Sequence, residues 1–81
     1  MNERWHDQIE SDPLILRGKP CFRGTRIPVG LILGYMACGK TAEEITREFP
    51  DLTAGHLTAA LEYARDLADF EAVDFEAAAL Q

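Results

Sequence analysis

Cysteine is scarce in this chain, and a long apolar run is missing. The two cysteines, Cys21 and Cys38, form no C-x-x-C pair and have no histidine at zinc-site spacing. This pattern predicts reduced thiols, as in a cytosolic protein, and no metal site. The longest apolar run, near residues 29–38, has about ten residues and is broken by glycine, which is too short to span a bilayer. Because the first seven residues are polar and acidic, they exclude a secretory signal, and we expect a cytoplasmic protein without a membrane contact.

Positive charge is also scarce, and it is unevenly distributed. The chain has 8 Lys/Arg against 14 Asp/Glu, a net charge of -6. Residues 1–40 hold six Lys/Arg and four Asp/Glu, whereas residues 41–81 hold two and ten, giving +2 and -8. A basic N-terminal module is therefore followed by an acidic one. Since 81 residues bury only roughly 60–65% of their unfolded surface, we expect one small domain that forms a homodimer.

The basic charge is concentrated in residues 17–29. This segment carries Arg17, Lys19, Arg23 and Arg26, and it has no carboxylate. Glycines and prolines punctuate it, so it predicts short extended pieces joined by tight turns. The cations could contact an anion, a nucleic acid or an acidic protein surface. Alternatively, they solvate turns and pair with nearby carboxylates such as those of Asp12, Glu43 or Glu44.

Among these cations Arg26 stands at a turn before a predicted helix. We expect its guanidinium to hold the hairpin by binding backbone carbonyls or an acid of the second helix. The glycines and prolines of the same stretch are predicted to be architectural, and so are the turn and cap residues that follow. This structural set comprises Gly18, Pro20, Gly24, Thr25, Pro28, Gly39, Thr41, Glu44, Pro50 and Thr53.

The sequence predicts a mainly α-helical fold with a short N-terminal β-hairpin. After a loose N-terminus, the hairpin occupies about residues 14–27, with strands near Leu14–Leu16 and Cys21–Phe22. A first helix runs over about 28–38, with Pro28 in its first turn, and ends at Gly39 in the left-handed region.

Two further helices follow. Thr41 and Glu44 form a capping box for a helix over about 42–49 that ends before Pro50. Thr53 caps a third helix over about 54–69, in which apolar residues keep the helical period. The four-residue connection between these two helices is typical of a helix-turn-helix. Residues 1–69 thus make a single domain, and the acidic and apolar extension 70–81 either continues the third helix or forms a tail.

Several of these short motifs together resemble a known family. They are Asp12-Pro13, Gly18-Lys19-Pro20, Gly24-Thr25-Arg26-Ile27-Pro28-Val29, Gly39, Thr41-Ala42-Glu43-Glu44-Ile45, Phe49-Pro50-Asp51-Leu52-Thr53 and Ala59-Ala60-Leu61-Glu62-Tyr63-Ala64. The chain resembles, over about residues 9–65, the domain-of-unknown-function family numbered 433 (DUF433). The resemblance implies a homeodomain-like three-helix helix-turn-helix fold. It also implies an antitoxin of a type II toxin–antitoxin pair, encoded beside a PIN-like nuclease toxin.

The third helix is a poor candidate for reading DNA. Base recognition at the start of such a helix uses hydrogen-bonding side chains, and only His56 and Thr58 provide them here. The acids that follow would repel phosphates, and neutralised phosphates supply most of the affinity for DNA. If DNA is bound, we expect its contacts on Arg17, Lys19, Arg23 and Arg26.

One match to a nucleotide-binding motif is accidental. Residues 34–41 satisfy the P-loop pattern G-x-x-x-x-G-K-[ST], but the chain is too short for the parallel sheet that a P-loop needs. A helix that ends at Gly39 and a cap at Thr41 explain the same letters. His6 and His56 have no Ser or Cys at a spacing that suggests an activated nucleophile. We expect neither an enzyme nor a cofactor.

Two functions of different classes therefore stand as predictions. The first is a protein-binding antitoxin, whose acidic C-terminal half docks on the basic cleft of a PIN-like nuclease through Phe70, Val73, Phe75 and Leu80. The second is a DNA-binding transcriptional regulator. The expected homodimer would pair the unpaired edges of the N-terminal strands.

Overall fold

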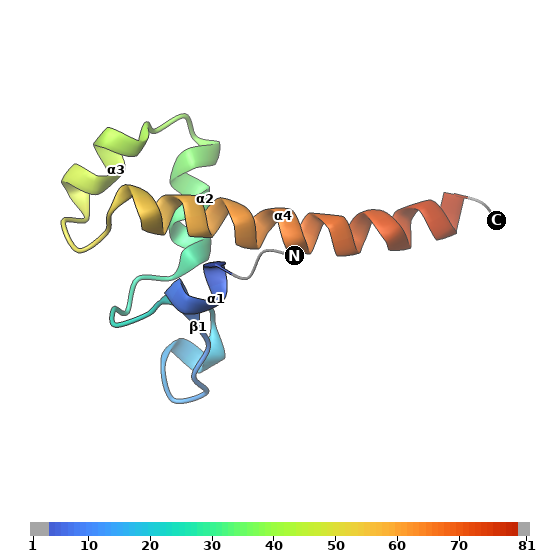
Figure 1. Ribbon diagram of the computed structural model, residues 1–81, viewed down its shortest axis with the longest axis horizontal. Coiled ribbons are helices and arrows are strands. Elements are labelled where there is room, and N and C mark those ends of the chain that lie inside the picture. Colours follow the sequence, from blue (N-terminus) through green and yellow to red (C-terminus); the bar gives the residue numbers. More distant parts are fainter. Residues whose placement is uncertain (1–3, 80–81) are drawn as a thin grey trace.

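The computed structural model describes the backbone of residues 4–79 and the side chains of residues 5–69. This part of the chain is mainly α-helical with a small antiparallel sheet, as the sequence predicts. Its elements are α1 (Arg4–Gln8), β1 (Ile9–Glu10), the 3-10 helix η1 (Leu16–Gly18), β2 (Cys21–Phe22), α2 (Val29–Ala37), α3 (Ala42–Glu48) and α4 (Ala54–Ala79). Figure 1 shows α4 crossing the whole molecule, with α3 on one side of it and the loop around η1 on the other.

The first strand of the hairpin lies elsewhere than the sequence suggests. β1 pairs antiparallel with β2, Ile9 opposite Phe22 and Glu10 opposite Cys21, so the predicted strand at Leu14–Leu16 is wrong. The Leu14 N–H donates to Asp12 Oδ1 at 2.9 Å, forming a local turn. Leu16 and Arg17 then adopt φ of 51° and 58°. Left-handed backbone cannot continue a strand, and it costs roughly 1–2 kcal/mol per L-residue.

The turn after β2 is built by the residues that the sequence marks as structural. Gly24 has φ of 81°, which only glycine adopts without strain. The Thr25 hydroxyl donates to the Phe22 carbonyl at 2.7 Å and accepts the Ile27 N–H at 3.0 Å. The Val29 N–H donates to the Pro20 carbonyl at 2.9 Å. These bonds return the chain to β2 and direct it into α2.

The ends of α2 and α3 agree closely with the predicted caps. α2 begins at Val29, one residue after the predicted start, with Pro28 as its N-cap, and Gly39 has φ of 93° after the helix. The Thr41 N–H donates to Glu44 Oε1 at 2.8 Å, while the Glu44 N–H donates to Thr41 Oγ1 at 3.1 Å. This reciprocal pair is the capping box that the sequence predicts. It gives a partner to the N–H groups of Thr41 and Glu44 at the start of α3.

The core lies where α2, α3 and α4 meet the hairpin. Phe22, Ile32 and Ile45 are fully buried, and replacing a buried Phe or Ile by Ala costs about 2–5 kcal/mol. All the buried side chains that the structure describes are apolar. This is the usual composition of a core, because charged side chains are almost never fully buried unless they are paired. Its members are Ile9, Phe22, Val29, Ile32, Ile45, Leu52, Leu57, Ala59 and Ala60.

Helix α4 is longer than predicted. It continues past residue 69 to Ala79, so the segment after the predicted end extends the helix. Its 26 residues span about 39 Å, most of the 47 Å long axis of the molecule. Figure 1 shows its C-terminal half projecting beyond the other elements. In the described part of the chain no helix is both long and apolar enough to cross a membrane.

The N-terminus is also more ordered than predicted. Residues 4–8 form α1, which packs on α4. The Trp5 indole N–H donates to Asp66 Oδ2 at 2.6 Å, and its ring meets that of Tyr63 edge-on at 4.9 Å. The hydrogen bond spans 61 residues of sequence, so local patterns around residues 1–8 could not reveal it.

Candidate functional site

Arg23 ties α1 to the hairpin. Its Nε donates to the Asp7 carbonyl and one terminal nitrogen to the His6 carbonyl, both at 3.0 Å. The other terminal nitrogen pairs with Glu10 Oε1 at 3.1 Å. The two carbonyls belong to the last turn of α1, where a cation complements the helix dipole. This is the role that the sequence analysis assigned to Arg26, so that assignment is wrong.

The other three cations of the basic segment are exposed. Arg17 and Lys19, together with Leu16, line a shallow hollow of about 260 Å³. Arg26 makes no hydrogen bond or ion pair with any side chain that the structure describes. The predicted DNA-contacting arginines are therefore all exposed, and Arg23 differs in being bonded within the fold.

His56 is part of the N-terminal cap of α4. The Thr53 N–H donates to His56 Nδ1 at 2.9 Å, and the His56 N–H donates to Thr53 Oγ1 at 3.4 Å. Because Nδ1 accepts, the neutral ring carries its proton on Nε2. The imidazole also meets the Phe22 ring edge-on at 5.6 Å. The structure thus confirms Thr53 as a cap and gives His56 a local role that the sequence analysis missed.

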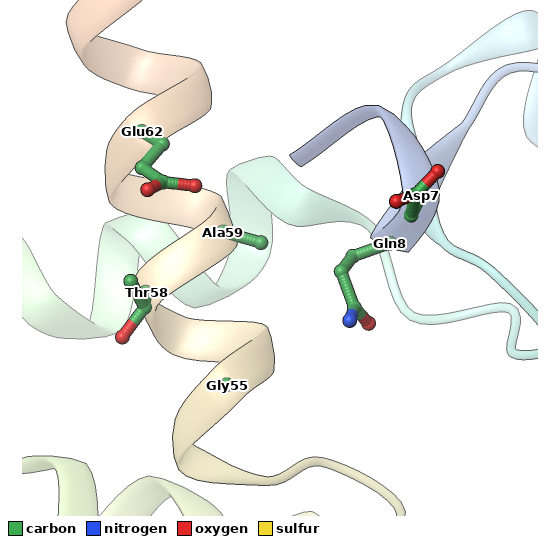
Figure 2. A pocket seen from close by; sticks show the side chains of 6 residues that line it. All are labelled: Asp7, Gln8, Gly55, Thr58, Ala59 and Glu62. Carbon is green, nitrogen blue, oxygen red and sulfur yellow. The ribbon is translucent and has the colours of Figure 1, made fainter. Parts of the chain in front are cut away.

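A cleft of about 370 Å³ lies between α1 and α4 (Figure 2). Asp7 and Gln8 line it from α1, and Thr58 and Glu62 line it from α4, with buried Ala59 between them. Two carboxylates around one opening attract hydrogen-bond donors and cations, and they repel phosphates. Thr58, a predicted DNA contact, stands on this acidic rim. The sequence analysis missed the cleft because it expected no element at residues 4–8.

Asp66 keeps its negative charge on α4. The hydrogen bond from Trp5 holds the pKa of its carboxyl below the usual range, and Arg65, at 3.4 Å, acts in the same direction. Beyond it, residues 65–79 carry one Arg against Asp66, Asp69, Glu71, Asp74 and Glu76, a net charge of -4. We call residues 65–79 the acidic helix segment. Phe70, Val73 and Phe75 lie in this segment, but their side chains, and all of Leu80, fall outside what the structure describes.

Apolar side chains are exposed beside these acids. Leu61 and Leu67 on α4 are 55% and 49% exposed. Leu61 also borders a groove of about 340 Å³ between α2, α3 and α4, together with Met36, Leu57 and Lys40. Six residues separate the two leucines, so they project about 120° apart around α4 and lie on different sides of the helix.

The Cys21 thiol and the residues of the P-loop pattern lie in structural positions. Burial, and then the negative charge of Glu10, raise the pKa of the Cys21 thiol, which makes it a poor nucleophile. Gly34 to Ala37 belong to α2, and Lys40 Nζ lies 6.0 Å from the centre of the Tyr35 ring. Among the described residues, no three His, Cys, Asp or Glu side chains gather as a metal ion would require.

The fold and these surfaces define a small helical protein with an N-terminal hairpin. The model of the family described as "Protein of unknown function (DUF433)" matches residues 9–64, and the chain belongs to this family. The matched residues include the basic segment, the caps Thr41 of α3 and Thr53 of α4, and the first part of α4. α1 and the whole of the acidic helix segment lie outside the match.

A solved structure supports the same assignment. The chain is similar to a DUF433 member protein from Anabaena variabilis ATCC 29413, with a TM-score of 0.70 and 29% sequence identity. The similarity covers 96% of this chain and 86% of that protein. No curated protein matches the chain.

Proposed function

We propose that this protein is a protein-binding antitoxin that neutralises a PIN-like nuclease in the cytoplasm. The observation that carries the proposal is α4, whose acidic helix segment projects past the other elements (Figure 1) with a net charge of -4. A nuclease that cleaves RNA must attract phosphates, so its cleft presents cations. A projecting acidic helix offers the same kind of charge as the RNA backbone.

The proposed mechanism is competition for the cleft. The carboxylates of the acidic helix segment bind the cations of the nuclease cleft that would otherwise bind substrate. The apolar residues of the segment add contact area. The hydrogen bond from Trp5 lowers the pKa of Asp66, so this carboxyl stays ionised to a lower pH than usual. The Trp5–Asp66 hydrogen bond and the edge-on contact between Trp5 and Tyr63 fix α4 where it leaves the core. A fixed helix loses less conformational entropy on binding than a disordered tail would.

Coexpression with the product of the neighbouring gene tests this proposal. A variant with Asp69→Asn, Glu71→Gln, Asp74→Asn and Glu76→Gln should no longer co-purify with the nuclease or block its cleavage of single-stranded RNA. A variant truncated after Asp69 should behave in the same way. The matched control neutralises three acids on α3 and the turn after it, Glu43→Gln, Glu48→Gln and Asp51→Asn, and should still bind. Full inhibition by both the neutralised and the truncated variant would overturn the proposal.

A DNA-binding regulator with a homeodomain-like helix-turn-helix is the second candidate. What favours it is the exposure of Arg17, Lys19 and Arg26. The bonded state of Arg23 and the acidic rim around Thr58 weigh against it. We expect a salt-dependent gel shift with the protein's own promoter that is lost in the triple Ala variant of Arg17, Lys19 and Arg26. Absence of any shift at low salt, with or without the nuclease, would remove this candidate.

A further inference from the structure

The cleft between α1 and α4 owes its space to small residues of α4. Gly55, Thr58, Ala59 and Glu62 follow the helical period, so they share the face of α4 that looks toward Gln8 on α1 (Figure 2). A glycine and an alanine leave room where longer side chains would reach toward α1. The cleft of about 370 Å³ lies at the lower end of the range for binding pockets, which is about 300–1,000 Å³. It therefore suits a single side chain or a small ligand.

The walls of this α1–α4 cleft are fixed by contacts outside it. Arg23 donates to the carbonyls of His6 and Asp7, both at 3.0 Å, and so holds the last turn of α1. Trp5 donates to Asp66 at 2.6 Å, which holds the first turn of α1 on α4. A ligand would therefore meet a cleft that is already formed, and its binding would cost little ordering of the protein.

Polar side chains of the cleft lack partners within the chain. The Asp7 carboxylate, the Gln8 amide and the Thr58 hydroxyl make no hydrogen bond with any residue that the structure describes. Gln8 is half-buried, and Figure 2 shows it reaching from α1 toward α4, while the Glu62 carboxylate is turned toward the same opening. A polar group that leaves water loses free energy unless it finds a partner. The cleft therefore calls for a cationic ligand that donates several hydrogen bonds.

Among cations, the side chain of arginine fits these walls best. In the described part of the chain no three His, Cys, Asp or Glu side chains gather, so the cleft does not offer the ligands of a metal site. The ammonium of lysine is a compact charge, whereas a guanidinium is planar and presents donors along two edges, which can reach both walls at once. We propose that the cleft receives an arginine side chain of a partner protein. Its guanidinium lies between the carboxylates of Asp7 and Glu62 and donates to the amide oxygen of Gln8.

The identity of the partner rests on the proposed function, in which a nuclease with a cationic cleft binds the acidic helix segment. Glu62 and Asp66 are one turn apart on α4, so the α1–α4 cleft opens beside the start of that segment. The same nuclease can then place an arginine from the rim of its own cleft between α1 and α4. The affinity of the cleft for a guanidinium does not depend on this identification.

Titration of the purified chain with N-acetyl-arginine amide, followed by NMR, tests the cleft without a nuclease. We expect saturable shifts of the Gln8 side-chain amide and of the Gly55 backbone amide, confined to residues around the cleft. N-acetyl-lysine amide should bind at least about threefold more weakly, because an ammonium cannot bond both walls with the same geometry. Equal binding of the two probes, or shifts that do not saturate, would overturn the proposal.

Two variants separate the shape of the cleft from its charge. Gly55→Leu fills the space and keeps both acids, and a Cβ at this position meets only Thr53 Oγ1, at an ordinary contact distance of 3.5 Å. Asp7→Asn/Glu62→Gln keeps the shape and removes the charge. Each variant should weaken the binding of N-acetyl-arginine amide by at least about tenfold. Full binding by Gly55→Leu would refute the proposal, since acidity alone would then hold the probe.

Matched controls complete the test. Glu43→Gln/Asp51→Asn removes two exposed acids that do not line the cleft, and it should bind the probe like the wild type. Trp5 fluorescence should stay unchanged in every variant, because none of them replaces a residue that contacts the indole. In coexpression, Gly55→Leu should weaken co-purification of the nuclease. A wild type that binds no nuclease would remove the proposed function, but the titration with N-acetyl-arginine amide would still decide the role of the cleft.

Discussion

At the scale of single residues, the four cations of the basic segment have different roles that the sequence does not distinguish. Arg23 and Arg26 both flank the Gly24-Thr25 turn, and nothing in their neighbours tells which one reaches back to residues 6–10. Strand pairing decides it, because Phe22 lies opposite Ile9 and so brings Arg23 beside the end of α1. Register is a property of the folded hairpin, and the sequence analysis placed the first strand wrongly.

Removal of the Arg23 guanidinium should loosen α1. We expect Arg23→Ala to lower the free energy of unfolding by about 1–2 kcal/mol, because two bonds to helix-end carbonyls and one exposed ion pair are lost. Arg26→Ala is the matched control and should stay within about 0.5 kcal/mol. Urea unfolding followed by the fluorescence of Trp5, the only tryptophan, measures both. Equal effects of the two substitutions would contradict this division of roles.

Asp66 should make the docking of α1 sensitive to acid. Its pKa is lower in the folded protein than in the unfolded chain, because Trp5 donates to the carboxylate. The stability that it contributes is therefore complete above the unfolded pKa, and it is lost as the pH falls through the folded pKa. We expect Trp5 fluorescence to shift toward that of exposed indole below the usual titration range of an aspartic acid.

Asp66→Asn separates this effect from general acid unfolding. The amide oxygen can still accept the indole N–H, but the side chain no longer titrates, so the acid shift of Trp5 fluorescence should be much reduced. Asp69→Asn, one turn further along α4, should titrate like the wild type. A shift of unchanged size in Asp66→Asn would mean that another group controls the docking of α1.

At the scale of elements, sequence prediction succeeded where the signal is local. The ends of α2 and the start of α3 depend on residues that touch within three or four positions, such as Thr41 and Glu44. The prediction of a strand at Leu14–Leu16 from its apolar residues failed. Leu14 and Leu16 lie in a turn that is formed by a hydrogen bond to Asp12 and by residues in the left-handed region. Sequence prediction also missed α1, whose docking depends on Asp66, far along the chain. For the same reason it did not predict the cleft between α1 and α4.

The capping box of α3 should contribute measurably to stability. Thr41→Ala removes the hydroxyl that accepts the Glu44 N–H, and we expect a loss of about 0.5–2 kcal/mol. Thr46 lies in the same helix, but its hydroxyl donates to the Ala42 carbonyl, which is already used within the helix. Thr46→Ala should therefore change the stability by no more than about 0.5 kcal/mol. Thermal unfolding of the two variants compares them, and a ranking in the opposite order would refute the capping role.

At the scale of the whole molecule, the uneven charge of the sequence becomes a division in space. Four of the eight basic residues lie at positions 17–26, in the hairpin region, whereas the acidic helix segment projects at the far end of α4 (Figure 1). Composition alone predicted the division, because it requires only counting along the chain. What composition could not supply is the direction of α4, which the core contacts of Leu57 and Ala60 and the contact between Trp5 and Tyr63 determine.

The projecting half of α4 should not be needed for the rest of the chain to fold. The described core residues, and those packed on them, all lie between Trp5 and Tyr63, so truncation after Asp69 removes none of them. We expect the truncated chain to unfold with a free energy within about 0.5 kcal/mol of the full chain, as for changes distant from a core. Truncation after Ala60 is the contrasting variant, because it removes Tyr63 and Asp66, the two residues that hold Trp5. We expect this variant to lose the native fluorescence of Trp5 and to unfold at a lower temperature. A large loss of stability on truncation after Asp69 would contradict this prediction, because the acidic helix segment would then be part of the folding unit. Loss of nuclease binding by the truncated variant could in that case not be attributed to the missing charge of the segment.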